Sequence, residues 1–334
     1  MSRLLDAHPN ANDAQEELSL RPQRLDEYIG QKDLKKNLRV FIGAALHREE
    51  CLDHLLFYGP PGLGKTTLAY VIGNEMNAHV HAVNGPSIEK TGDLAAILTA
   101  LEPGDILFID EIHRLPRIVE ESLYTAMEDY KFSVVINRDS NGKALTLDLP
   151  PFTIIGATTR AGDLSAPLRA RFGITEKLNF YDQDEIQQIV MRTARVLKTE
   201  ITPEAAKEIA KRSRGTPRIA NRLFRRVRDF ANFEGKDSID YNDAISALNA
   251  LKVDSIGLDD VDIRYLKTLI ERFRGGPVGL DTLANAIGEE IMNLEDVYEP
   301  YLLQIGFIDR TSRGRVANDK AYKHLHITHQ ERLF

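Results

Sequence analysis

The sequence has a single cysteine, no tryptophan and no long apolar run. Because Cys51 has no second cysteine to pair with, a disulfide framework within the chain is excluded, and this usage is typical of a reducing compartment. No run approaches the roughly 18 apolar residues that cross a bilayer. Residues 1–18 are polar and acidic without the apolar segment of a signal peptide, so we interpret them as a mobile tail. We therefore expect a cytoplasmic protein without membrane contact.

The sequence also lacks an excess of positive charge. Its formal net charge of −7 argues against a protein that coats nucleic acid with its whole surface, so any DNA contact requires a local basic patch. The hydrophobic share of 43% and the charged share of 28% are ordinary for a globular protein. A length of 334 residues suggests two or three domains, at roughly 100–200 residues each.

A glycine-rich segment follows an apolar run at residues 55–58. It reads Gly-Pro-Pro-Gly-Leu-Gly-Lys-Thr over residues 59–66 and fits G-x-x-x-x-G-K-[ST], with a strand pattern before it and a helix pattern after it. Its glycines let backbone N–H groups surround phosphate oxygens. Lys65 supplies a charge for the β- and γ-phosphates, and the Thr66 hydroxyl is placed for Mg²⁺. The segment therefore predicts a nucleoside-triphosphate site.

Two acidic residues, Asp110 and Glu111, end the apolar strand pattern at residues 106–109. A carboxylate at the carboxyl end of a parallel strand lies beside the phosphate loop, so we expect Asp110 to hold Mg²⁺. Glu111 is placed to polarise the water that attacks the γ-phosphate. The pair favours hydrolysis over nucleotide binding alone.

The order of patterns indicates an α/β fold with three parts. Strand and helix patterns alternate up to about residue 181, which predicts a parallel sheet covered on both faces. Two β-rich runs around an Asn-Gly turn, at residues 132–147, interrupt this alternation as a hairpin. Residues 182–253 are helical throughout. Residues 254–334 combine short helices with a small basic β-hairpin, the outline of a winged helix, so we expect domains at 1–181, 182–253 and 254–334.

Weaker signals surround the phosphate loop. Thr158 and Thr159 end the next apolar strand, where a hydroxyl can sense the γ-phosphate. Arg169 and Arg171 are one residue apart in a loop. Their spacing alone favours a solvated basic loop, although an arginine at a subunit boundary can neutralise transition-state charge in a neighbouring site.

A basic segment lies in the helical part. Residues 207–228 carry nine lysines or arginines against Glu208 alone, a composition typical of a solvated helix face. Arg218 is the expected exception, because it opens a helix together with Pro217 and is rigidly placed to reach a phosphate.

Five motifs occur in a recognisable order: Gly-Pro-Pro-Gly-Leu-Gly-Lys-Thr-Thr, Phe-Ile-Asp-Glu-Ile-His-Arg-Leu, Gly-Ala-Thr-Thr-Arg, Pro-Leu-Arg-Ala-Arg-Phe-Gly and Arg-Gly-Thr-Pro-Arg-Ile-Ala-Asn-Arg-Leu. Together they resemble the RuvB family, the bacterial Holliday-junction branch-migration motors of the AAA+ class. The resemblance runs from about residue 18 to about residue 326. It implies an AAA+ P-loop ATPase domain, a small helical lid domain and a winged-helix domain, assembled as a homo-hexameric ring around duplex DNA.

The resemblance also implies roles for individual residues. It implies ATP and Mg²⁺ as cofactors, the junction-binding protein RuvA as a partner that docks on the hairpin at 132–147, and RuvC in the resolving complex. The function implied is branch migration of Holliday junctions in homologous recombination and DNA repair. The residues match the Walker residues and their loop (Gly62, Gly64, Lys65, Thr66, Thr67, Asp110, Glu111), sensor 1 (Thr159), the arginine finger in trans (Arg171), sensor 2 (Arg218), the base and ribose pocket (Leu20, Arg21, Tyr181) and DNA-backbone contacts (Arg310, Arg315).

Other AAA+ classes predict different features. A clamp-loader-like ATPase shares the ATPase core but ends in an all-helical collar, and a protein unfoldase needs an aromatic pore loop that the residues after Val83 do not provide. A nucleotide-binding scaffold without turnover is disfavoured by Glu111 and Arg171. Where relatives often have arginine after Gly-Glu-Glu, this chain has Ile291, so a DNA contact from residues 290–293 is not carried over.

Overall fold

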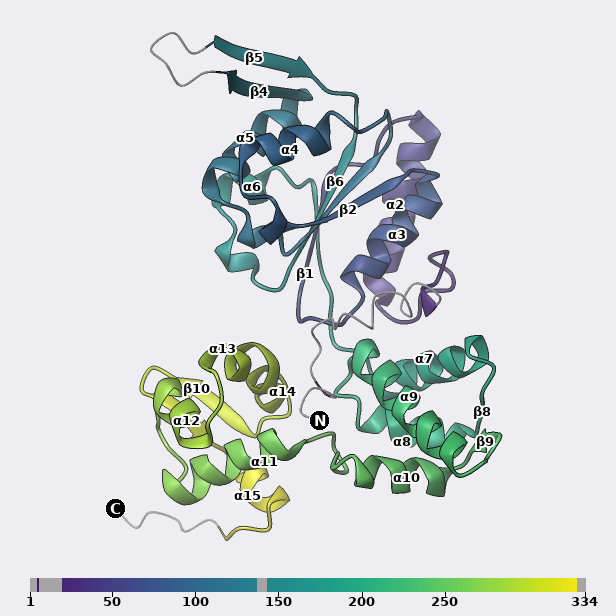
Figure 1. Ribbon diagram of the computed structural model, residues 1–334, viewed down its shortest axis with the longest axis vertical. Helices are drawn as coiled ribbons and strands as arrows, with labels where there is room; N and C mark the ends of the chain where they lie inside the picture. The colour runs from purple at the N-terminus through teal and green to yellow at the C-terminus, as the bar shows by residue number, and fades with distance from the viewer. Residues whose placement is uncertain (1–4, 6–19, 137–142, 329–334) are drawn as a thin grey trace. The chain divides into compact units, whose positions relative to one another are not determined.

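The computed structural model describes residue 5, residues 20–136 and residues 143–328. Apart from Leu5, the expected tail at 1–18 lies outside this range, as does the turn of the expected hairpin at 137–142. A boundary between Tyr181 and Asp182 separates two compact units, which we describe one at a time (Figure 1). Over the described residues, no helix combines the length and the apolar character needed to cross a membrane.

The first unit is built on a five-stranded parallel sheet. The strands are β1 (Leu55–Tyr58), β2 (Val80–Asn84), β3 (Ile106–Asp110), β6 (Thr153–Thr158) and β7 (Ile174–Lys177), in the spatial order β2-β3-β6-β1-β7. Near-continuous apolar runs suit a sheet covered on both faces, and every residue of β6 is buried. Because all five strands are parallel, their carboxyl ends meet at one edge.

Helices cover both faces of this sheet. Figure 1 shows α2 (Lys32–Arg48) and α3 (Lys65–Met76) on one side, and α4 (Thr91–Leu98), α5 (Arg117–Asp129) and α6 (Ala166–Ala170) on the other. The apolar stripe of α2 is buried at Leu34, Leu38, Ile42 and Ala45. The same periodicity also predicts burial of Phe41, which is wrong, since this ring is exposed.

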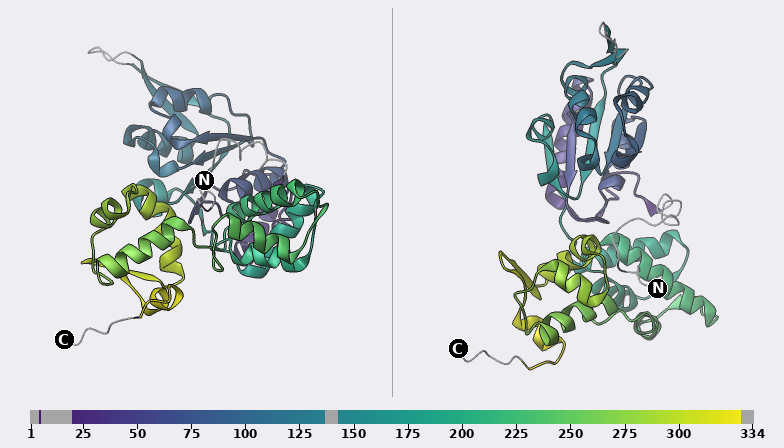
Figure 2. Two further views of the ribbon diagram at one scale, coloured as in Figure 1. Left: turned by 60° about the horizontal axis from the view of Figure 1, so that its bottom comes forward. Right: turned by 60° about the vertical axis from the view of Figure 1, so that its left-hand side comes forward.

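The antiparallel hairpin is present where the β-rich runs predict it. Strands β4 (Lys131–Ile136) and β5 (Lys143–Asp148) pair in register, with Phe132 opposite Leu147, and the hairpin extends beyond the helices of its unit (Figure 2). Its base is anchored, because Phe132 is fully buried in the core of this unit. Further out, Leu145 is 47% exposed.

The second unit begins with four helices: α7 (Gln183–Val196), α8 (Pro203–Lys211), α9 (Pro217–Phe233) and α10 (Tyr241–Ala250). A two-stranded parallel pair, β8 (Glu200–Ile201) and β9 (Ser238–Ile239), lies among them. Thr202 caps α8 as its sequence predicts, because its hydroxyl accepts a hydrogen bond from the N–H of Ala205 at 3.2 Å. Thr216 does not cap α9 in this way, since its hydroxyl donates to the carbonyl of Arg214 instead.

The basic segment at 207–228 is not the solvated face that its composition predicts. Arg212, Arg214, Arg222 and Arg225 are all buried. The Arg212 guanidinium donates to the Glu208 carboxylate at 2.9 Å and to the carbonyl of Val253 at 2.7 Å, which satisfies its charge inside the protein. Buried arginines need such partners. For Arg212 these lie one helical turn back and about 40 residues ahead in the sequence, so the composition of the segment does not reveal them.

The last part of the chain packs short helices around a small hairpin. Its helices are α11 (Asp260–Lys267), α12 (Leu280–Ile287), α13 (Ile291–Asn293), α14 (Glu299–Gln304) and α15 (Asp319–His324), with π-helical turns at Thr268–Arg272 and Leu294–Tyr298. Strands β10 (Ile308–Thr311) and β11 (Gly314–Ala317) form the antiparallel hairpin, and Val278 bridges to Arg315 at its edge. One apolar core, which includes Tyr265, Leu302 and Ile308, holds these elements together.

Candidate functional site

The phosphate loop joins β1 to α3 and is closed around its lysine. The side chain of Lys65 is buried, and its ammonium group donates to the carbonyls of Gly59 at 2.7 Å and Pro60 at 2.9 Å. Gly64 has a φ of 100°, and a Cβ there would lie 2.6 Å from the hydroxyl of Tyr28. Only glycine fits this conformation and this contact, so the loop keeps a shape that a phosphate group can enter.

The Asp110 carboxylate lies beside this loop. Asp110 ends β3, one strand removed from β1 across β6, and the Thr66 hydroxyl is 3.4 Å from its Oδ2 atom. The hydroxyl and the carboxylate thus converge at the carboxyl edge of the sheet. Oxygen donors of these two kinds are the ligands that Mg²⁺ takes beside nucleotide phosphates.

Glu111 is held by a chain of polar contacts that the sequence does not reveal. Its φ of 51° turns the backbone sharply after β3, and its Oε2 atom lies 3.5 Å from Nε2 of His113. On the other side of the ring, Nδ1 of His113 is 2.9 Å from the Thr158 hydroxyl, which accepts the N–H of Arg160 at 2.9 Å. Burial lowers the pKa of His113, more than the Glu111 carboxylate raises it, so the ring is neutral near pH 7. His113 therefore lies between the Glu111 carboxylate and the end of β6.

Two tyrosines close the loop from the other side. The hydroxyls of Tyr28 and Tyr181 are 2.8 Å apart, and both lie within hydrogen-bond distance of the carbonyl of Leu63, at 3.2 Å and 3.0 Å. Burial raises the pKa of Tyr28 well above its usual value, and Tyr181 raises it further. Leu20 is buried, and the guanidinium of the next residue, Arg21, lies 4.5 Å from the ring centre of Tyr70. Tyr181 thus joins the loop directly, whereas Arg21 lies against α3.

Arg171 follows α6 and packs on the face of α5. Its guanidinium lies 4.4 Å from the ring centre of Tyr124, forms an ion pair with Glu128 at 3.1 Å and donates to the carbonyl of Pro167 at 2.8 Å. The side chain is 21% exposed. A solvated basic loop is therefore a poor description of Arg171, which a ring face and a carboxylate hold in a defined orientation.

The other residues that the sequence predicts at the nucleotide site are Thr67, Thr159 and Arg218. Thr67 is the third residue of α3, and Thr159 directly follows β6; both are half-buried. In the second unit, Arg218 is the second residue of α9 and is also half-buried.

The two arginines of the C-terminal hairpin share one buried acid. Arg315 donates to Glu299 twice, at 2.8 Å and 3.0 Å, and Arg310 donates to the same carboxylate at 2.6 Å. Tyr265 completes the cluster with a 2.8 Å hydrogen bond. Glu299 is fully buried and Arg315 is 14% exposed, whereas Arg310 is 43% exposed and also pairs with Glu295 at 3.4 Å. Arg310 is thus the more accessible of the two cations.

Comparison with known proteins decides the family. The family models for the Holliday junction DNA helicase RuvB P-loop domain, the RuvB AAA lid domain and the RuvB C-terminal winged helix domain match residues 20–178, 181–254 and 255–326. The chain belongs to the RuvB family. It is therefore an AAA+ ATPase and a Holliday-junction branch-migration motor, of the nucleotide-binding, DNA-binding class that serves recombination and repair.

Individual relatives agree with this family assignment. The "Holliday junction branch migration complex subunit RuvB" of Limosilactobacillus reuteri is 57% identical over 325 residues, which cover 97% of this chain and 96% of the relative. A solved structure of the Thermotoga maritima RuvB Holliday junction branch migration motor is 51% identical and covers 93% of this chain and 99% of that one, with a TM-score of 0.84. A variant of the same Thermotoga protein is 52% identical, with a TM-score of 0.84 over 92% of this chain and 98% of that one.

The RuvB assignment confirms the expected family, fold class and activity, and it removes the clamp-loader alternative, because the last domain carries a winged helix and not a helical collar. No sequence motif assigns a functional role to Tyr28, His113, Tyr124 or Glu299. The one available signal was position: His113 lies two residues after Glu111, close enough to reach the strand end beside it.

Proposed function

We propose that this RuvB-family chain hydrolyses ATP with Mg²⁺ in a homo-hexameric ring that acts with RuvA on duplex DNA at four-way junctions, with RuvC in the resolving complex. The observation that carries the proposal is the convergence of Lys65, Thr66 and Asp110 at one edge of the sheet, with Glu111 adjacent. The Limosilactobacillus relative is a branch migration complex subunit, which supports a partner in the complex. A cytoplasmic location follows from a DNA substrate and fits the single cysteine.

Each residue of the nucleotide site has a separate task in this proposal. Thr66 and Asp110 would hold Mg²⁺, which neutralises charge on the phosphates when it is bound. Lys65 exchanges its two loop carbonyls for phosphate oxygens, assisted by the N–H groups of Gly62 and Gly64 and by Thr67 at the start of α3. Glu111 orients the attacking water and accepts its proton, and the ring of His113 lies beside its carboxylate.

The other proposed contacts come from the margins of the site. Leu20, Arg21 and Tyr181 surround the base and ribose, and Thr159 senses the γ-phosphate. Arg218 reaches the phosphates from the second unit, and Arg171 reaches those of the neighbouring subunit. We assign these roles to domains at 1–181, 182–253 and 254–334.

Arg310 and Arg315 are proposed to contact the DNA backbone from the winged helix. Arg310 is supported as the first contact by its greater exposure. Arg315 is tied to Glu299 by two hydrogen bonds, so it orients the hairpin as well as adding charge. Phosphate contacts carry no sequence information, which suits a motor that moves along any sequence.

The Glu299 cluster gives a prediction about acid stability. Burial alone would raise the pKa of Glu299, but hydrogen bonds from Arg315, Arg310 and Tyr265 together lower it below the ordinary value of 4.5. Its stabilising effect is therefore complete above about pH 4.5 and is lost as pH falls through the lowered pKa. Glu299→Gln should lower the free energy of unfolding by about 2 kcal/mol at pH 7, and by less at pH 3. Urea unfolding at both pH values checks this. The matched control is Glu271→Gln, which changes an exposed carboxylate. The prediction would be contradicted if Glu299→Gln lowered the free energy of unfolding by the same amount at both pH values.

The β4–β5 hairpin gives a prediction about RuvA. Its outer side chain Leu145 is exposed although it lies on a β-strand, so a charge there should spare folding and disturb docking. Leu145→Asp is expected to abolish stimulation of the ATPase by RuvA and to leave the DNA-independent ATPase intact. Ile136, the other residue we assign to docking, has a side chain outside the described residues. The control is Thr146→Asp, on the opposite face of β5. Loss of basal ATPase and of folding together in Leu145→Asp would mark Leu145 as core.

One experiment tests the proposed function as a whole. ATPase activity of the full chain is measured with four-way-junction DNA plus RuvA, with a primed sliding clamp, and with unfolded protein. Strong stimulation by junction DNA plus RuvA alone is expected, together with ATP-dependent conversion of the junction to duplex products. Stimulation by clamp or unfolded protein, without any by the junction, would overturn the proposal.

A further inference from the structure

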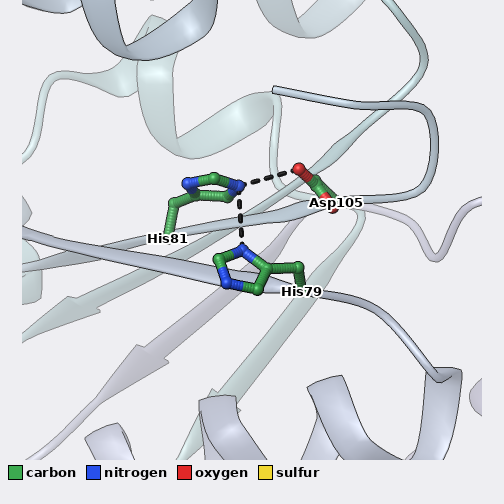
Figure 3. A group of neighbouring side chains, drawn as sticks. All are labelled: His79, His81 and Asp105. Carbon is green, nitrogen blue, oxygen red and sulfur yellow. Dashed lines mark hydrogen bonds and ion pairs between the residues drawn. The ribbon is translucent and has the colours of Figure 1, made fainter. Parts of the chain in front are cut away.

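Three metal-ligating side chains gather at the end of the sheet opposite the nucleotide site. His79 directly precedes β2, His81 lies within it, and Asp105 directly precedes β3. Residues two apart on an extended strand point to the same side, so both imidazoles face one way. The register of the parallel pair places Val80 beside Ile106, and this brings His79 level with Asp105 (Figure 3).

The possible ligand atoms of these three side chains lie close to one another. Nδ1 of His79 is 3.0 Å from Nε2 of His81, which is 2.7 Å from Oδ2 of Asp105, and all three ligand atoms lie within 4.8 Å of one another. A tetrahedral zinc ion with ligand distances near 2.1 Å separates its ligand atoms by about 3.4 Å. To admit the ion, the His79–His81 and His81–Asp105 contacts would lengthen by roughly 0.4 Å and 0.7 Å through rotation of the side chains.

Hydrogen bonds alone satisfy this group poorly. A ring nitrogen carries at most one hydrogen, so Nε2 of His81 cannot donate a full hydrogen bond to both His79 and Asp105. If Nε2 of His81 instead accepts a hydrogen bond from Nδ1–H of His79, its remaining neighbour is Oδ2 of Asp105 at 2.7 Å. Nε2 and Oδ2 then face each other without a hydrogen between them. A cation on which the three atoms converge uses all the lone pairs at once.

Asp105 is the anchored member of the group. It is buried, and its Oδ2 atom also accepts the N–H of Glu102 at 2.9 Å, which fixes the carboxylate as an outer partner fixes a metal ligand. His79 is exposed, which leaves the fourth position open to water.

We propose that His79, His81 and Asp105 form a binding site for a divalent transition-metal ion of the Zn²⁺ class. Two imidazoles and a carboxylate suit zinc and its neighbours, whereas Mg²⁺ and Ca²⁺ prefer oxygen ligands alone. The site lies about 16 Å along β3 from Asp110, at five residues of roughly 3.3 Å each, so it is separate from the Mg²⁺ proposed beside ATP. A bound ion ties edge strand β2 to β3, the strand that carries Asp110.

The test is direct titration of the full chain, without nucleotide, with Zn²⁺ alone in competition with a chromogenic chelator. One equivalent per chain is expected, and Zn²⁺ should raise the melting temperature. Loss of an outer partner typically weakens a metal site by about 10–100-fold, so His81→Ala and His79→Ala should each weaken binding by at least that much. The exposed His47→Ala on α2 is the matched control and should bind as the parent does.

Two further measurements separate the site from unspecific binding. Asp105→Asn keeps the shape of the carboxylate but removes its charge, so a folded Asp105→Asn chain should still lose affinity. Co²⁺ in place of Zn²⁺ should give the intense visible absorption of a four-coordinate ion, absent in His81→Ala. Equal affinity in parent, His79→Ala and His81→Ala, or no stoichiometric binding by the folded parent, would overturn the proposal.

Discussion

A Glu111→Gln chain is expected to bind ATP as the parent does and to hydrolyse it at least about 100-fold more slowly, the low end of what a general base contributes. Glutamine keeps the size of the side chain and its position beside His113, but it cannot accept a proton from water. Since Glu111 acts on the water and not on the phosphates, the affinity for nucleotide should be spared. Steady-state phosphate release and equilibrium binding of a fluorescent ATP analogue measure the two quantities separately.

Lys65→Ala is the complementary change, because it should affect the binding of ATP, which Glu111→Gln should spare. Lys65 is buried and already held by the carbonyls of Gly59 and Pro60, so it is poised to meet phosphate oxygens. Its removal should weaken ATP binding and thereby reduce turnover. The matched control for Glu111→Gln is Glu89→Gln, which removes an exposed carboxylate. Parental turnover in Glu111→Gln would show that the base is assigned to the wrong residue.

The parts of this protein that the sequence predicts are those fixed by local rules. The phosphate loop needs glycines at set spacings, and buried parallel strands need apolar runs, so the sequence predicts that Lys65, Thr66 and Asp110 lie near one another. They do so at one edge of the sheet, and their roles stay a prediction. The hairpin at 132–147 is found because its β-rich runs interrupt a regular alternation of strands and helices. In each case a few neighbouring residues determine the structure.

Contacts between distant residues are what the sequence could not supply. Tyr124 and Arg171 meet across 47 positions, and Arg214 forms a buried ion pair with Asp262 across 48. A composition count therefore mistakes buried arginines for a solvated face. Likewise the link from Glu111 through His113 to Thr158 exists only because β3 and β6 are neighbours in the sheet.

Arg171 is expected to act on ATP bound by the neighbouring subunit, and its loss should slow hydrolysis by roughly 10³-fold or more. Within its own chain the guanidinium is oriented by Tyr124, Glu128 and the carbonyl of Pro167. These contacts present a rigid planar fork at the end of α6, and Lys cannot reproduce that fork, so Arg171→Lys should recover little activity.

Mixing two inactive chains tests whether the site is shared. An Arg171→Ala chain keeps an intact phosphate loop but lacks the finger, and a Lys65→Ala chain keeps the finger but lacks an intact loop. Neither chain alone should therefore hydrolyse ATP well. In a mixed ring some interfaces pair the intact loop of one subunit with the intact finger of the next, and part of the ATPase activity should return. The control is a mixture of Glu111→Gln and Lys65→Ala chains, in which no interface regains both an intact loop and an intact base. If mixed rings form and the Arg171→Ala mixture restores nothing, then Arg171 serves its own subunit, because a residue acting only in cis cannot be complemented by its neighbour.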